Sequence, residues 1–90
     1  NQPASKKTNS IIKKRTYLGE SYPGIYFTVR ETQIATLLRQ KNYREIAEHY
    51  HLSKRTVEYY IETIKYKLKC ADKKHLIAKL EIINFFTAHP

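Results

Sequence analysis

The sequence predicts an all-α domain of four helices, preceded by a basic and mostly irregular N-terminal segment. Two observations support this prediction. From Thr28 onward, apolar residues recur every three or four positions, which is the period of an amphipathic helix and not of a strand. Each apolar series also follows a residue that can cap a helix N-terminus. We therefore divide the chain into residues 1–27, a linker or the edge of a preceding domain, and residues 28–90, the helical domain.

The segment before Thr28 combines polar and aromatic character. Asn1–Ser10 is polar and contains lysines, which is typical of disordered chain. Turn-forming residues, Gly19, Pro23 and Gly24, interrupt the remainder. Its aromatic residues are too many for a spacer alone, so we expect part of it to pack on the helical domain. These residues are Tyr17, Tyr22, Tyr26 and Phe27.

The first helix is expected to begin directly after Thr28. Thr28 and Glu31 have the spacing of a capping box, in which each side chain accepts a hydrogen bond from the other residue's backbone amide. Ile34, Ala35 and Leu38 then form one apolar stripe, which we expect to be buried.

Two further helices follow, with only a short turn at residues 50–53 between them. Asn42 can cap the second helix and Ser53 the third. Each helix has one apolar stripe: Tyr43, Ile46, Ala47 and Tyr50 in the second, and Val57, Tyr60, Ile61, Ile64 and Leu68 in the third. Ala47 is small, as a close crossing of the two helices requires. A short helix, a tight turn and a longer basic helix form a helix-turn-helix, whose second helix docks in the DNA major groove.

The fourth helix is expected to be apolar on two faces. Asp72 can cap it, and one face carries Leu76, Leu80 and Ile83 toward the core. The other face carries Ala78, Ile82 and Phe85. A helix that is apolar on two sides buries both. Two explanations stay open: a second copy of the chain covers this face in a homodimer, or the tyrosine-rich segment before Thr28 folds over it.

The charge balance favours a polyanionic partner. Lysine and arginine total 17 against 8 acidic residues, for a net charge of +9, and both residues 1–27 and residues 28–90 are basic. Each lysine or arginine that neutralises a nucleic-acid phosphate releases the counterion bound there, and this release favours binding. Cys70 is the only cysteine, which excludes an intrachain disulfide and fits a reducing cytoplasm. We expect a cytoplasmic protein without a membrane span. The chain begins at Asn1 and not at methionine, which either a longer protein or processing would explain.

Short motifs occur in a fixed order between Phe27 and Leu80. They are Thr28-Val29-Arg30-Glu31, Glu45-Ile46-Ala47, Ser53-Lys54-Arg55-Thr56-Val57 and Lys67-Leu68. In this order and at nearly these separations, they resemble the LuxR-type (GerE-like) helix-turn-helix DNA-binding domain of bacterial transcription regulators. The resemblance implies that residues 53–69 form the recognition helix, that the fourth helix dimerises, and that a signal domain precedes the chain. His51 stands where this family often has a glycine or asparagine in a left-handed turn.

The resemblance also implies which residues contact DNA. Family members read bases from the positions occupied here by Glu58, Tyr59 and Glu62, with phosphate contacts around them. A carboxylate can accept a hydrogen bond from cytosine, and Arg55 can bind guanine or a phosphate. Alternatively, the two acids are solvated and paired with lysines along the helix. The predicted DNA-binding residues are Lys54, Arg55, Thr56, Glu58, Tyr59, Glu62, Lys65, Lys69, Lys41 and Arg44; the predicted dimer face is Ala78, Ile82 and Phe85.

Two other functions remain open at this point. One is a sigma-factor-like promoter-reading domain, which would also bind RNA polymerase. The other is a protein-interaction module that keeps the fold and does not bind DNA, for which the acids on the recognition face are the best argument. No metal or cofactor is expected, because His49 and His51 have no further histidine or cysteine at a suitable spacing. Enzymatic activity is not expected, because no nucleophile has an evident base beside it.

Overall fold

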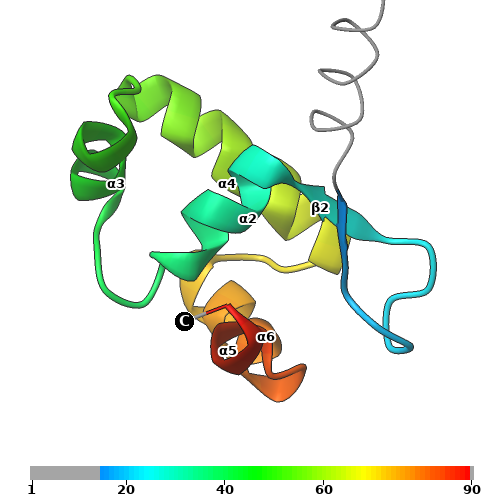
Figure 1. Ribbon diagram of the computed structural model, residues 1–90. Coiled ribbons are helices and arrows are strands. Elements are labelled where there is room, and N and C mark those ends of the chain that lie inside the picture. Colours follow the sequence, from blue (N-terminus) through cyan, green and yellow to red (C-terminus); the bar gives the residue numbers. More distant parts are fainter. Residues whose placement is uncertain (1–14, 90) are drawn as a thin grey trace, which may run out of the picture.

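A computed structural model describes residues 15–89, so the expected disorder of Asn1–Ser10 lies outside the described residues. Within residues 15–89, two strands precede five helices: β1 (Arg15–Tyr17), β2 (Tyr26–Thr28), α2 (Val29–Thr36), α3 (Tyr43–Tyr50), α4 (Lys54–Leu68), α5 (Lys73–Ile82) and α6 (Phe85–Ala88). Figure 1 shows α3 at one end of α4 and the two strands at the other. The four predicted helices are confirmed as α2 to α5, while the strands and α6 were not predicted.

The helices share one core, built from the apolar stripes. Burying one apolar side chain of the size of valine, leucine, isoleucine or phenylalanine contributes roughly 1.5–3 kcal/mol. The residues of this core therefore account for most of the favourable free energy of folding. Tyr43, Tyr50 and Tyr60 lie at the margin of the core and are only partly buried. The fully buried side chains are Phe27, Ile34, Leu38, Ile46, Val57, Ile61, Ile64, Leu68, Leu76 and Leu80.

The predicted helix starts are confirmed by their capping hydrogen bonds. At the start of α2, the Thr28 amide donates to Glu31 Oε1 at 2.8 Å and the Glu31 amide donates to Thr28 Oγ1 at 3.3 Å. At the start of α5, the His75 amide donates to Asp72 Oδ1 at 2.8 Å. These bonds occupy backbone groups that the first turn of a helix leaves without partners.

Residues 15–28 form an antiparallel hairpin that packs on the helices. Arg15 lies opposite Thr28 and Tyr17 opposite Tyr26 in the register. Phe27 is fully buried and meets the ring of Phe85 edge-on, with 5.7 Å between ring centroids. The prediction that part of the aromatic N-terminal segment packs on the domain is therefore confirmed. The division of the chain at residue 28 stays a prediction.

The chain reverses between α5 and α6, and this changes the predicted fourth helix. Asn84 has a left-handed backbone conformation with φ of 61°, so the helical spacing of α5 does not continue through it. Phe85 and Phe86 are consequently turned into the core, with exposed fractions of 3% and 7%. The prediction that Phe85 shares the second face of the helix with Ala78 and Ile82 is wrong for this reason; Phe85 packs in the core against Phe27 of the hairpin.

Candidate nucleic-acid interface

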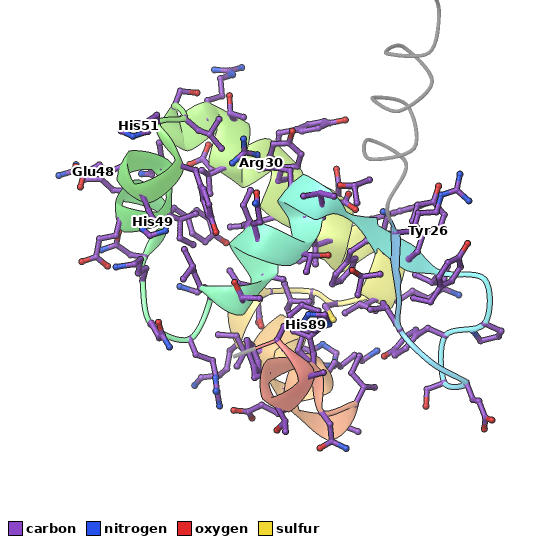
Figure 2. All side chains as sticks on the ribbon, in the orientation of Figure 1. Tyr26, Arg30, Glu48, His49, His51 and His89 are labelled. Atoms are coloured by element: carbon purple, nitrogen blue, oxygen red, sulfur yellow. The ribbon has the colours of Figure 1, made fainter. Side chains whose placement is uncertain are left out.

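The turn between α3 and α4 has the tight geometry that a helix-turn-helix requires. His51 adopts the left-handed conformation, with φ of 57°, and ends α3 at the corner labelled in Figure 2. The Leu52 amide donates to the Ala47 carbonyl at 2.8 Å, which closes the turn. Ala47 is buried, as expected for a close helix crossing. His51 therefore adopts the left-handed conformation, although it stands where the family often has a glycine or asparagine.

Both helices of this unit are capped as predicted. The Glu45 amide donates to Asn42 Oδ1 at 2.8 Å, and the Thr56 amide donates to Ser53 Oγ at 3.0 Å. Glu45 also accepts a hydrogen bond from the Asn42 amide, which completes a capping box. The sequence analysis missed this second half, although the Asn-x-x-Glu spacing is visible in the sequence.

One face of α4 is buried and the other is open to solvent. Ile61, Ile64 and Leu68 point into the core with Val57. The exposed face includes two large aromatic residues, Tyr59 at 68% and Tyr66 at 85% exposure. Thr56 is half-buried, and its hydroxyl accepts a hydrogen bond from Ser53 Oγ at 2.9 Å. Of the predicted DNA-binding residues in α4 and at its C-terminal end, the others that are exposed are Lys54, Arg55, Glu58, Glu62 and Lys69.

The charged residues of this face differ in their partners. Glu62 pairs with Lys65 at 2.7 Å, so the alternative of an acid paired along the helix applies to it. Its carboxylate holds the pKa of Lys65 above the ordinary lysine value. Lys54, Arg55 and Glu58 form no ion pair within residues 15–89. Their charges are therefore available to a ligand.

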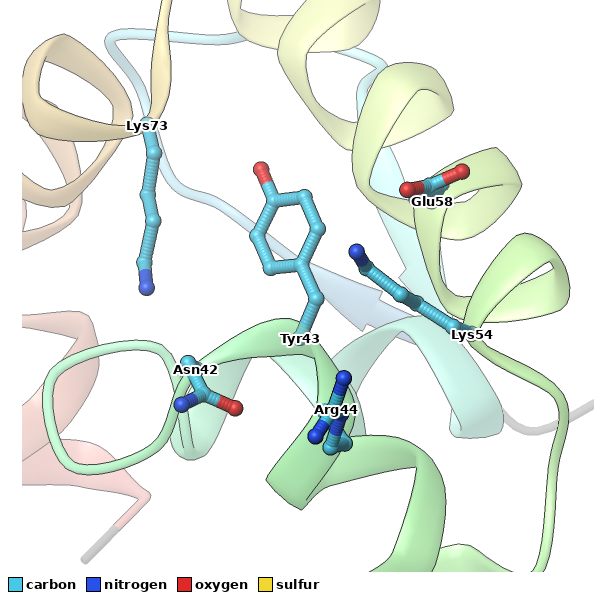
Figure 3. A pocket seen from close by; sticks show the side chains of 6 residues that line it. All are labelled: Asn42, Tyr43, Arg44, Lys54, Glu58 and Lys73. Atoms are coloured by element: carbon cyan, nitrogen blue, oxygen red, sulfur yellow. The ribbon is translucent and has the colours of Figure 1, made fainter.

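A groove of about 560 Å³ lies beside this face, where α3, α4 and α5 begin. Figure 3 shows the Tyr43 ring at its centre, with Lys73 on one side and Lys54 on the other. Burial raises the pKa of the Tyr43 hydroxyl, and this hydroxyl can donate a hydrogen bond. Lys41 is half-buried and does not line the groove. The lining residues are Asn42, Tyr43, Arg44, Lys54, Glu58 and Lys73.

At the far end of α4, a buried ion pair joins two of the sequence motifs. Glu31, which is 4% exposed, accepts a hydrogen bond from Lys67 Nζ at 2.6 Å. Lys67 Nζ also donates to the Tyr26 carbonyl at 2.8 Å and thus ties α4 to the hairpin, where Figure 2 labels Tyr26. This pair was not predicted, because the Arg30-Glu31 and Lys67-Leu68 motifs lie far apart in the sequence.

The second face of α5 is smaller than predicted. Ala78 is exposed and Ile82 is 77% exposed, which leaves a large aliphatic side chain in solvent. Cys70 is half-buried and does not belong to this face; burial raises the pKa of its thiol. No group of three potential metal ligands occurs within residues 15–89, and no helix there is long and apolar enough to cross a membrane.

A known protein family matches the part of the chain that contains the helix-turn-helix. The model of bacterial regulatory proteins, luxR family (GerE), matches residues 26–80, which are more than half of the chain. No curated protein and no solved structure matches. The matched residues run from β2 through most of α5 and include the complete helix-turn-helix. The chain therefore belongs to the luxR family of bacterial regulatory proteins and carries the helix-turn-helix DNA-binding domain of that family.

Proposed function

We propose that this domain binds double-stranded DNA sequence-specifically, with α4 in the major groove and the start of α3 against the phosphate backbone. The observation that carries the proposal is the exposed start of α4, where Lys54 and Arg55 have no charged partner within residues 15–89. In a helix-turn-helix, this end of the second helix approaches the base edges. The chain would act in the cytoplasm as part of a transcription regulator.

The individual roles follow from position and chemistry. Arg55 is suited to a guanine or a phosphate, and Glu58 to the amino group of a cytosine. Tyr59 offers its ring to a thymine methyl group and its hydroxyl to a phosphate. Arg44 and Lys41, near the start of α3, are proposed phosphate contacts, as is Lys69, which caps the end of α4. Lys65 is proposed as a further phosphate contact, for which it would have to leave its partner Glu62. Thr56 presents its hydroxyl in the first turn of α4.

A salt titration of duplex binding tests the proposal against its rivals. The logarithm of the binding constant should fall linearly with the logarithm of salt concentration, with a slope of about −0.9 for each phosphate neutralised. Competition by a random-sequence duplex then measures specificity. A protein-interaction module would show no affinity for duplex DNA, which would contradict the proposal. A sigma-like domain would bind purified RNA polymerase in a pull-down. We expect this chain to bind duplex DNA without RNA polymerase.

We further propose that the chain binds DNA as a homodimer through Ala78 and Ile82 on α5. The supporting observation is the exposure of the Ile82 side chain, because burying an exposed aliphatic side chain is favourable. Ile82→Glu should give a folded monomer that binds one half-site and loses cooperativity on two half-sites about one helical turn (10–10.5 base pairs) apart. Ile82→Leu is the matched control. Sedimentation and gel-shift titrations measure both; persistent two-site cooperativity in Ile82→Glu would contradict the dimer face.

A further inference from the structure

Three cationic side chains from three different helices line the groove at the start of α4. Arg44 belongs to α3, Lys54 to α4 and Lys73 to α5. None of them forms an ion pair within residues 15–89. Like charges that line one groove without an acidic partner repel one another, and an anion in the groove would relieve this repulsion. Glu58 is the single acidic residue in the lining.

Lys73 is the member of this group that lies outside the helix-turn-helix. Its side chain is half-buried, and Nζ lies 5.4 Å from the centroid of the Tyr43 ring. Nζ also donates to the Lys41 carbonyl at 3.4 Å, which is long for a hydrogen bond and engages only one of the three ammonium protons. The cation–π contact with Tyr43 and the contact with Lys41 leave donors of Lys73 free, and Lys73 lies at one side of the groove (Figure 3).

We propose that Lys73, together with Arg44 and Lys54, binds a phosphate group of the DNA backbone in this groove. The inference rests on the proposed DNA-binding function and adds α5 to the DNA contact. A phosphate fits because the guanidinium and the ammonium groups donate to its oxygens from several directions. The Tyr43 hydroxyl has no hydrogen-bond partner within residues 15–89 and supplies a further donor. A backbone phosphate carries no sequence information, so this contact would set the register of α4 in the DNA major groove.

The test compares Lys73→Gln with Lys74→Gln on the same duplexes. Lys74 is the next residue of α5, is exposed and does not line the groove, so the two variants lose the same net charge. We expect Lys73→Gln to reduce the magnitude of the salt slope by about 0.9 and to weaken binding roughly five- to tenfold at 0.1 M salt, equally on specific and random sequences. Lys74→Gln should keep the wild-type slope, and Lys73→Arg should restore it.

Each remaining outcome counts against the proposal. Identical salt slopes for Lys73→Gln and Lys74→Gln would overturn the contact while leaving the proposed DNA binding intact. A lower melting temperature of Lys73→Gln by circular dichroism with an unchanged salt slope would assign Lys73 a purely structural role through Lys41. Loss of binding at one base position only would make Lys73 a base contact. If the wild-type chain itself showed no salt-dependent duplex binding, the proposed function would fail, and this inference with it.

Discussion

The two halves of α4 are both rich in charge but differ in where that charge is directed. In the first half, Lys54, Arg55 and Glu58 are exposed and form no ion pair within residues 15–89. In the second half, Lys65 pairs with Glu62 at 2.7 Å, and Lys67 pairs with the buried Glu31 at 2.6 Å. The first half borders a groove, whereas in the second half Lys67 also donates a hydrogen bond to Tyr26 of the hairpin.

This difference shows that the basic character of a helix does not by itself locate a DNA contact. A lysine that already has a carboxylate partner stabilises the fold and would have to give up that partner to bind a phosphate. An unpaired cation does not carry this cost. The first half of α4 is therefore the better candidate for DNA binding, and the second half serves mainly to hold α4 against α2 and the hairpin.

The largest expected effect is on stability and comes from the second half. Lys67→Ala should lower the free energy of unfolding by about 2–4 kcal/mol, because the Glu31 carboxylate would stay buried and lose its cationic partner. Denaturant unfolding measures the change. Lys74→Ala, at an exposed position of α5, is the control and should change stability by less than about 0.5 kcal/mol. A Lys67→Ala variant as stable as the control would remove the contrast between the halves.

The next effect is on DNA binding and comes from the first half. Arg55→Ala should weaken specific binding by about 1–3 kcal/mol and relax the preference at one base position if Arg55 binds guanine. Its stability should stay within about 0.5 kcal/mol of wild type, because the side chain is exposed. Fluorescence anisotropy on a set of single-base duplex variants measures this.

Arg39→Ala is the control for Arg55, because Arg39 stacks on Phe86 and pairs with Glu81 outside α4. It should leave DNA affinity unchanged. A uniform loss on all sequences would identify Arg55 as a phosphate contact. Unchanged binding of Arg55→Ala would exclude it from the interface.

The smallest effect concerns the ion pair of Glu62 and Lys65 in the second half. Glu62→Gln should lower the free energy of unfolding by only about 0.2–0.5 kcal/mol, because the Glu62 side chain is 68% exposed and the pair is three residues apart on one helix. The Glu62 carboxylate raises the pKa of Lys65 in the folded state. The ion pair therefore contributes to the free energy of unfolding at neutral pH, and this contribution is lost as the pH rises through the raised pKa of Lys65. Unfolding at neutral and strongly alkaline pH measures it; a loss as large as that of Lys67→Ala would contradict the comparison.

Local sequence signals predicted most of the fold. The helix starts at Thr28, Asn42, Ser53 and Asp72 were correct, because a cap and its acceptor lie within three residues of each other. Most residues of the predicted stripes are buried, because helical periodicity is a property of the adjacent sequence. The exceptions are only partly buried: Tyr43, Tyr50, Tyr60 and Ile83. The same reasoning predicted the exposed face of α4. Whether those exposed residues contact DNA stays a prediction.

Other features depended on residues far apart in the chain. Glu31 and Lys67 are 36 positions apart, and neither residue's neighbours specify the other as its partner. Phe85 was assigned to the wrong face because its orientation depends on the left-handed Asn84 and on the space beside Phe27. Such pairings are decided by which surfaces meet when the core closes, and a helical period carries no information about this.

The sequence by itself determined four helices, a tight turn at His51 and a helix-turn-helix of the luxR family, because capping, periodicity and motif spacing are local. Only the tertiary structure decided which charges of α4 remain free. It placed Lys67 beside Glu31 and brought Lys73 of α5 to the groove that Arg44 and Lys54 line. The reason is physical: the partner of a charged side chain is set by the packing of distant elements, and that packing exists only in the folded chain.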